Sequence, residues 1–560
     1  MQMQIPLFKA LLNMRKFFFF IALGICQVFH VWAQPANSSI ARPKLVVGIV
    51  VDQMRWDFLY RYYNRYSEDG FKRMLKEGFS CENTYINYLP SFTAVGHTCI
   101  FTGSVPSISG ITGNDWVDQL TGAHVYCTED STVQSVGVEY APDGKMSPRN
   151  LLVSTITDEL RMATNYQSRV VGISLKDRAA ILPAGHTANA AFWMDDSSGN
   201  FISSSYYMKR LPEAVENFNK QKNIEHFTNS EWNTLYPINT YIESDSDNKS
   251  YEGKLTGELL PVFPHNIKSA YAKNHASFRS TPFGNSLTLD FAKTILDAYQ
   301  LGQGTATDFL TINCASTDYV GHLFGPNSVE IEDTYLRLDL DLATFFSYLD
   351  KKVGKGEYLV FLTADHGVSH AVGYSQANRM PADYFANMNI LNSLDQLIQQ
   401  KLGYFKVIRS GGNYQINFDM EKIAAYNADF DAIKKLVVDY LKKQPGVAYA
   451  VDIEKIQDAP IPELVKTMII NGYNFKRSGQ VQVIFQPGWL ESYARTGSTH
   501  GTWNPYDTHI PLIFMGWDIH SGASAARVNM TDIAPTLATL LHIQTPDGNI
   551  GTPIMDLLTR

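Results

Sequence analysis

Residues 44–52 read KLVVGIVVD, an apolar and mostly β-branched run that ends on an aspartate. Two later runs have the same form, DFLTINCASTDYVGH over residues 308–322 and YLVFLTADHG over residues 358–367. Continuous apolar runs of this length are typical of strands buried on both faces, as in a parallel sheet covered by helices. The expected strands cover residues 44–51, 309–314 and 358–363.

Amphipathic segments alternate with such runs and place apolar residues three or four positions apart, on one helical stripe. The expected helices cover residues 70–77, 285–300, 328–350 and 430–443. Strands that alternate with helices predict an α/β fold, in which a mostly parallel sheet is sandwiched by helices. Ligands of such folds bind outside the carboxyl ends of the strands.

Two stretches break the alternation. Residues 190–284 are rich in Asn, Ser and Tyr, and residues 381–489 contain a β-α-β pattern of their own. We interpret both as insertions that form an α+β cap beside the active site. The core then comprises residues 34–189, 285–380 and 490–560.

The composition is that of a globular protein, because 45% of the 560 residues are hydrophobic and 18% are charged. This length fits one large domain with insertions, or two domains. The formal net charge of -8 gives no sign of a nucleic-acid surface.

The N-terminus has the pattern of a secretory signal. Residues 14–16 (MRK) carry two positive charges, residues 17–26 are apolar throughout, and residues 31–33 (VWA) form an acceptable cleavage site. We expect residues 1–33 to be removed, with Met14 as an alternative start, and the mature chain to be periplasmic or secreted. A membrane anchor is the alternative, but the apolar run is shorter than the roughly 20 residues that a span requires.

Cysteine use agrees with an exported protein. Cys26 would leave with the signal, and the mature chain keeps Cys81, Cys99, Cys127 and Cys314. Four cysteines permit disulfides in three connectivities. None of them has the spacing of a zinc finger, so we expect them to be structural or free and not metal ligands.

Aspartates and histidines follow the expected strands, and a further histidine stands in GSTHG near the C-terminus. Carboxylate oxygen and imidazole nitrogen are ligands of catalytic zinc, although such sets also accept other divalent ions. One Asp–His pair could equally be a buried hydrogen bond, but the whole set predicts two adjacent metal sites. The candidate ligands are Asp52, Asp318, His322, Asp365, His366 and His500.

Thr93 is the candidate nucleophile. It lies in NYLPSFTAVGHTCIFTG, between a strand-like run and a segment that can open a helix. A transferring phosphoryl group would be stabilised by the positive end of that helix, and a bound zinc would lower the pKa of the threonine hydroxyl. The alternative is that Thr93 only caps the helix.

Lys176 and Arg178, the two cations of the segment KDR over residues 176–178, are candidate anion ligands. Alternate residues of an extended segment face the same way, so the two cations would point together toward a phosphate dianion. Asn114 would add a neutral donor. The alternative is a solvated surface turn.

The order and spacing of these motifs resemble the alkaline phosphatase superfamily, and more closely its PafA-type phosphate-monoester phosphatases with a threonine nucleophile. The resemblance runs across nearly all of residues 44–558. The motifs that carry it are VVGIVVDQMRWDFL, PSFTAVGHTCIFTG, GITGNDW, SLKDRAA, STDYVGHLFG, TADHG, STHGTWNPYDTHIPLIFMG and TDIAPTLATLL.

The resemblance implies an exported, zinc-dependent alkaline phosphatase that hydrolyses small phosphate monoesters through a phosphothreonine intermediate. It assigns one zinc to Asp52, Thr93, Asp365 and His366, and the other to Asp318, His322 and His500. It assigns the phosphoryl oxygens to Asn114, Lys176 and Arg178. No stable membrane span is expected after signal cleavage, and the oligomeric state stays open.

Two other functions fit the same residues less well. A phosphodiesterase or nucleotide pyrophosphatase on the same bimetal core is the first, and the two cations near the phosphoryl group argue against it. A non-catalytic zinc-binding or adhesion module is the second, and it would be expected to have lost a ligand or the nucleophile. Among the remaining histidines, we expect His97 and His509 to lie nearest the site.

Overall fold

The computed structural model describes residues 40–559 apart from residues 140–141, 386 and 492–494. The chain divides into the units Met1–Arg42 and Pro43–Arg560, and the elements below all belong to the second. The expected signal over residues 1–33 lies outside the described residues. Of the described helices, none has the length and apolarity needed to cross a membrane.

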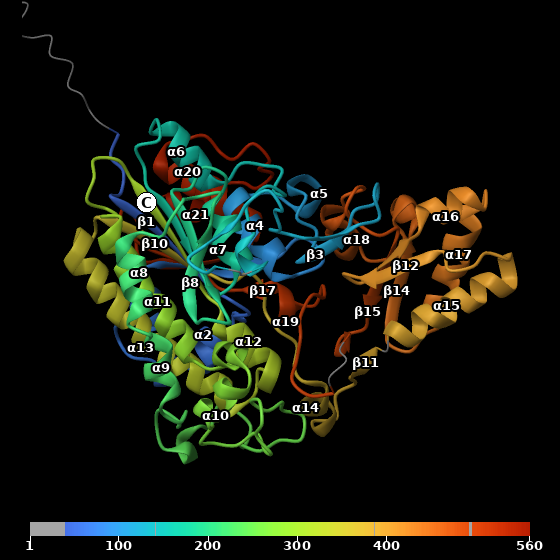
Figure 1. The fold of residues 1–560 in the computed structure, drawn as a ribbon, viewed down its shortest axis with the longest axis horizontal. Coiled ribbons are helices and arrows are strands. Elements are labelled where there is room, and N and C mark those ends of the chain that lie inside the picture. Colours follow the sequence, from blue (N-terminus) through green and yellow to red (C-terminus); the bar gives the residue numbers. More distant parts are fainter. Residues whose placement is uncertain (1–39, 140–141, 386, 492–494, 560) are drawn as a thin grey trace, which may run out of the picture. The chain divides into compact units, whose positions relative to one another are not determined.

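An eleven-stranded sheet, as far as the described residues define it, runs through the centre of the second unit (Figure 1). Its strands lie in the order β17-β2-β18-β10-β1-β9-β6-β7-β8-β5, with β19 paired to β2. The bounds are β1 Leu45–Val51, β2 Phe79–Tyr85, β5 Ser135–Val136, β6 Val170–Ile173, β7 Ala190–Asp195, β8 Asn200–Ser204, β9 Asp308–Cys314, β10 Tyr358–Thr363, β17 His509–Ile510, β18 Leu512–Gly516 and β19 Gly522–Asn529.

The centre of this sheet is parallel. β1 pairs in parallel with β10 on one side and with β9 on the other, and β9, β6 and β7 continue in the same direction. In the register, Val50 lies opposite both Thr363 and Asn313. The carboxyl ends of the three central strands are therefore level, which brings the residues after them to one edge.

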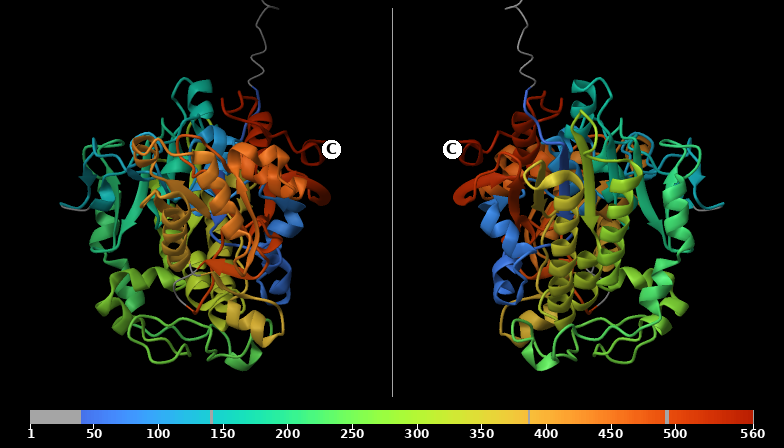
Figure 2. Two further views of the ribbon diagram at one scale, coloured as in Figure 1. Left: turned by 90° about the vertical axis from the view of Figure 1, so that its right-hand side faces the viewer. Right: turned by 90° about the vertical axis from the view of Figure 1, so that its left-hand side faces the viewer.

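Helices cover both faces of the sheet, and neighbouring side chains of β7 show this. Phe192 stacks edge-on against Phe291 of α11, with ring centroids 5.7 Å apart, whereas Trp193 packs with Ala180 and Ile181 of α7. Successive strand residues point to opposite faces, so α7 and α11 lie on opposite sides. Figure 2 (right) looks onto the α11 and α13 side. The covering helices include α4 Thr93–Thr102, α7 Asp177–Ala184, α11 Phe283–Ala298, α13 Val329–Leu349 and α20 Ile533–Leu541.

The α/β prediction is confirmed, and the predicted elements agree with β1, β9, β10, α11 and α13 to within two residues at each end. Shorter predicted helices correspond to α3 (Phe71–Glu77) and α17 (Phe430–Leu441). One boundary differs. We expected an insertion from residue 190, but β7 and β8 join the main sheet, because the apolar run AAFWM is itself a buried strand.

A second, four-stranded sheet lies within residues 381–489, in the order β12-β13-β15-β14. It has a hydrophobic cluster of its own, in which Phe418, Ile433, Val437 and Phe485 pack together. Its elements are α15 Asn387–Leu402, β12 Ile408–Gly412, β13 Gln415–Phe418, α16 Met420–Ala425, α17, β14 Val447–Asp452, α18 Glu463–Gly472 and β15 Val481–Phe485. Among the described residues, the cysteines Cys81, Cys99, Cys127 and Cys314 are buried, and none forms a disulfide.

Candidate active site

The first group of side chains is collected at the level carboxyl ends of β1 and β10. Asp52 directly follows β1, and Asp365 and His366 follow β10. His366 Nε2 lies 3.3 Å from Asp365 Oδ2 and 3.7 Å from Asp52 Oδ1, and all three residues are completely buried. One ligand atom from each residue thus converges on a single point.

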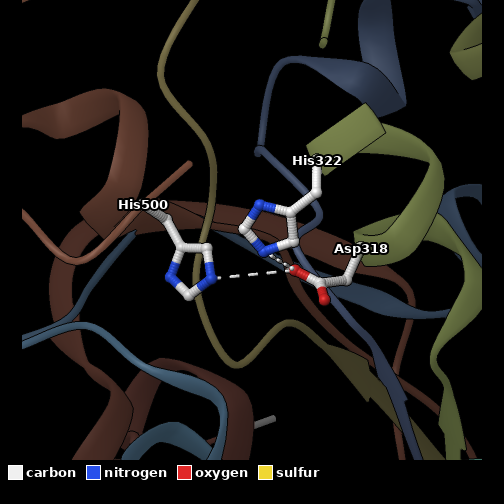
Figure 3. A group of neighbouring side chains, drawn as sticks. All are labelled: Asp318, His322 and His500. Atoms are coloured by element: carbon white, nitrogen blue, oxygen red, sulfur yellow. Dashed lines mark ion pairs between the residues drawn. The ribbon is translucent and has the colours of Figure 1, made fainter. Parts of the chain in front are cut away.

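The second group uses a helix instead of a strand end. Asp318 and His322 both lie on α12 (Ser316–Phe324), which starts two residues after β9. A separation of four positions puts two side chains on one face of a helix. His322 Nε2 lies 3.1 Å and His500 Nε2 lies 3.7 Å from Asp318 Oδ1 (Figure 3). We expected Asp318 at a strand end, and it lies instead in the first turn of this helix.

The two groups are adjacent. The rings of His366 and His500, one from each group, stack with centroids 3.5 Å apart at an angle of 11°. Lys176 Nζ lies 2.9 Å from Asp52 Oδ2 and 2.6 Å from Asp318 Oδ2, so one buried ammonium touches both groups.

The orientation of the three imidazoles suits metal ligands. Nδ1 of His322, His366 and His500 lies 2.9, 3.0 and 2.7 Å from the backbone carbonyl oxygens of Ser498, Gly367 and Ser91. A carbonyl can only accept, so each Nδ1 donates its hydrogen and each Nε2 keeps a free lone pair. Second-sphere hydrogen bonds of this kind fix the tautomer of ligating histidines.

Two carboxylate oxygens are also available to bind a metal ion. Asp52 Oδ1 and Asp365 Oδ2 are buried and accept no hydrogen bond from the described residues. Buried charged oxygens without a partner are costly, so a cation between them would be strongly favoured. The donor set therefore fits a pair of divalent metal ions.

Electrostatics distinguish the two aspartates nearest Lys176. Burial, and then the charge of Asp365, raises the pKa of Asp52 well above its usual range. Burial would also raise the pKa of Asp318, but His322 and Lys176 together hold it well below. Burial and the neighbouring His366 keep the pKa of His500 far below its usual value, so its ring is neutral.

Thr93 is the first residue of α4, and the residue before it, Phe92, is the N-cap. The hydroxyl therefore does not cap the helix. Oγ1 lies 3.4 Å from His366 Nε2, and the residue is 1% exposed. His97, one turn later, has Nδ1 2.9 Å from the Thr93 carbonyl oxygen and 3.3 Å from Asp365 Oδ2. The expectation that His97 lies beside the site is thus confirmed.

Two predicted placements need correction. Lys176 is the last extended residue before α7, and Arg178 is already helical, so the two cations do not alternate along an extended segment. The Arg178 side chain is positioned by Tyr126, because its Nη1 donates to Tyr126 Oη at 3.1 Å. His509 lies outside the site. Its ring stacks between Trp56 and Tyr85, and its Nε2 is 3.0 Å from the Glu82 carbonyl oxygen.

Asn114 lies at the N-terminus of α4, where its Oδ1 accepts a hydrogen bond from Ala94 N at 3.0 Å. The sequence analysis missed Gln53, which donates from its backbone to Asp365 at 3.1 Å and from its side-chain amide to Asp318 at 2.6 Å. Its position directly after Asp52 is the signal that could have identified it.

Comparison with known proteins decides the family. The sequence profile of the type I phosphodiesterase / nucleotide pyrophosphatase family matches residues 46–507, which include every candidate site residue.

The chain belongs to this family.

Within the family, the relatives of this chain include alkaline phosphatases. Alkaline phosphatase PafA of Elizabethkingia meningoseptica is 51% identical over 96% of this chain and 98% of its own length. Alkaline phosphatase PhoV of Synechococcus elongatus is 52% identical over 93% of this chain and 94% of its own. The crystal structure of wild-type PafA superposes with a TM-score of 0.91, at 52% identity, over 93% of this chain and 100% of that one. This family member is therefore an enzyme of the alkaline phosphatase type, as the resemblance predicted.

Proposed function

We propose that the chain is an exported, zinc-dependent alkaline phosphatase that hydrolyses phosphate monoesters through a phosphothreonine formed on Thr93. The observation that carries this proposal is the convergence of two Asp/His groups, joined by stacked His366 and His500, beside the Thr93 hydroxyl. The PafA and PhoV names of the relatives support the same activity.

Two zinc ions fit the donor sets described above. Asp52, Asp365, His366 and the Thr93 oxygen would hold one ion, and the second would be held by Asp318, His322 and His500. When bound, such ions supply Lewis-acid stabilisation of the reacting oxygens and lower the pKa of a coordinated hydroxyl or water. The protein fixes the three imidazoles through backbone carbonyl oxygens.

Thr93 would exchange its hydroxyl hydrogen for the phosphoryl group. In the first step a bond forms from Thr93 Oγ to phosphorus as the bond from phosphorus to the alcohol oxygen breaks, and the alcohol leaves with a proton. In the second step a water oxygen bonds to phosphorus as the bond to Thr93 Oγ breaks. Thr93 regains its hydrogen, and inorganic phosphate is released.

The transferring group would be neutralised by the residues around Thr93. Lys176 and Arg178 supply two positive charges, which match the two negative charges of a monoester. The amide of Asn114 sits at the start of α4, whose N-terminus favours anions. A solved variant of PafA carries substitutions of a threonine, an asparagine, a lysine and an arginine with the same spacing as Thr93, Asn114, Lys176 and Arg178, which supports a shared role for them.

The alternative function is that of a phosphodiesterase or nucleotide pyrophosphatase, since the description of the family names both activities. A diester has one negative charge at the phosphoryl group and needs room for a second organic substituent. The ratio of kcat/KM for p-nitrophenyl phosphate to that for bis-p-nitrophenyl phosphate separates the two. A strong preference for the monoester is expected, and a preference for the diester would establish the alternative.

The proposed nucleophile is tested with Thr93→Ala in purified, zinc-loaded protein. Loss of the proposed nucleophilic oxygen should lower kcat on the order of 10³-fold or more, while Thr93→Ser, which keeps a hydroxyl, should retain measurable turnover. Zinc content, measured by plasma emission, should be two ions in the parent. Full turnover by Thr93→Ala, or by protein stripped of metal, contradicts the proposal.

Export is tested separately, by sequencing the N-terminus of the mature protein from fractionated cells. We expect cleavage after residue 33, at Gln34. Recovery of an uncleaved chain in the membrane fraction would instead support an anchor.

A further inference from the structure

The turn between β12 and β13 is part of the second sheet, yet its side chains reach the candidate active site. Asn413 and Tyr414 both adopt left-handed backbone conformations, with φ of 57° and 59°. Two successive residues with positive φ make a tight hairpin of the kind that asparagine favours. The side chains of Asn413 and Tyr414 both contact segments outside this sheet.

Tyr414 contacts the loop that carries a candidate metal ligand. Its hydroxyl donates to the backbone carbonyl of His500 at 2.7 Å, and its ring packs against Phe92, with centroids 5.8 Å apart. Gly501 fits closely under these rings, since a Cβ there would lie 2.5 Å from Phe92 and 2.6 Å from Tyr414. With Ser91 holding Nδ1 of His500, the ligand is fixed at both its ring and its backbone.

Asn413 contacts the loop that carries a candidate phosphoryl ligand. Its side-chain amide donates to the backbone carbonyl of Asp115 at 2.7 Å. Asp115 directly follows Asn114, which is tied to the start of α4. The close approach depends on Gly113, where a Cβ would lie 2.5 Å from the Asn413 amide nitrogen.

We infer that this turn is a positioning element with two separable tasks, in which Tyr414 fixes His500 for metal binding and Asn413 fixes the Asn114 loop for phosphate binding. The inference rests on the proposed function, which supplies the roles of His500 and Asn114. Neither Tyr414 nor Asn413 is a catalytic residue. Each acts through the backbone next to one.

The test measures metal retention and phosphate affinity independently in two variants. Tyr414→Phe removes one hydroxyl. We expect its affinity for one zinc ion, measured by competition with a chelator, to fall about 10-fold, which is the lower limit for the loss of a second-sphere hydrogen bond. Its Ki for inorganic phosphate, measured with zinc restored to saturation, should stay at the parent value. Tyr404→Phe is the control. The Tyr404 hydroxyl accepts a hydrogen bond from Asp429 N at 3.4 Å, and both residues belong to the region of the four-stranded sheet.

Asn413→Gly should give the opposite pattern, with zinc retention unchanged and the Ki for phosphate and the KM raised several-fold. Glycine is chosen because it tolerates positive φ, where alanine would be strained. Asn413→Asp, which also tolerates this conformation but cannot donate, should behave in the same way.

Two outcomes would overturn the inference. The first is parent-like zinc retention in Tyr414→Phe together with parent-like phosphate affinity in Asn413→Gly. The second is a parallel change of both quantities in every variant, which would mean that the turn only stabilises the fold. A parent enzyme without bound zinc would remove the proposed function itself, whereas a zinc-loaded parent with unaffected variants removes this inference alone.

Discussion

Lys176 links the two candidate metal-ligand groups, and we propose that it also contacts the phosphoryl group. Its ammonium contacts both Asp52 and Asp318, and Nζ lies 4.8 Å from the centroid of the Tyr319 ring. Asp318 and Asp52 raise the pKa of Lys176 beyond its usual range despite burial, so the side chain stays charged. A fixed positive charge at this point favours the more negative of two substrates.

Lys176→Ala should therefore change substrate preference as well as rate. A charged hydrogen bond contributes about 1.5–3 kcal/mol, so kcat/KM for p-nitrophenyl phosphate should fall about 10- to 100-fold more than that for the bis ester. The ratio of the two values is the measurement, in zinc-saturated protein. Equal losses for both esters would show that Lys176 only maintains the ligands.

At this scale the candidate ligands Asp52, Asp365 and His366 could be predicted, because they follow apolar runs that a parallel sheet buries. The partners of the ligands could not. Gln53 reaches Asp318, and Tyr414 reaches the loop of His500, through contacts between segments far apart in the chain. Only the position of Gln53 directly after Asp52 gave a local signal, and the sequence around Tyr414 gave none.

Among the elements, α4 is the one whose packing determines the position of Thr93, the proposed nucleophile. Gly96, one turn after Thr93, lies so close to the end of β10 that a Cβ would be 2.3 Å from the Asp365 carbonyl oxygen. The missing side chain lets helix and strand meet directly.

Gly96→Ala should push α4 away from Asp365 and displace Thr93 with it. Overpacking of a buried contact costs about 1–3 kcal/mol, which would appear as a lower melting temperature, and kcat should fall although every reacting group is present. Gly304→Ala is the matched control, because the nearest atom to its added Cβ is 3.5 Å away. Parent-like kcat in Gly96→Ala would show that the helix can yield without moving Thr93.

Element boundaries show where sequence reasoning stops. The strands were found because burial on both faces leaves continuous apolar runs, as in β1, which is buried at every position. The start of α7 at Asp177 was missed, since K-D-R carries no periodic signal before the helix begins. The orientation of Arg178 was missed with it.

For the molecule as a whole, His265 ties the long segment before α11 to the core. Its Nδ1 lies 3.0 Å from Glu258 and its Nε2 lies 3.1 Å from Glu330 of α13, and the imidazole is completely buried. Burial alone would lower the pKa of His265, but the two glutamates raise it to about 9.

A histidine pKa raised by folding stabilises the protein fully below the unfolded value of about 6.5 and loses its effect as pH rises through about 9. The free energy of unfolding should thus fall between these pH values by about 3 kcal/mol at most. The melting temperature should fall with it. Glu252, whose pKa burial and Glu330 raise to about 9, acts in the same direction.

The contribution of His265 is isolated with His265→Gln, which should show a flatter pH dependence than the parent over the same range at saturating zinc. The readout is a series of thermal unfolding curves. Identical slopes for the two proteins would mean that His265 does not hold the proton.

The segments that carry the candidate ligands run from Asp52, directly after the first strand, to His500 near the end of the chain. No fragment released early from the ribosome contains a complete second metal group, so ion loading has to follow synthesis of nearly the whole polypeptide. If the chain is exported before it folds and binds zinc, as proposed above, the metal would be taken up in the compartment of arrival, and the supply of zinc there would set how much active enzyme is formed.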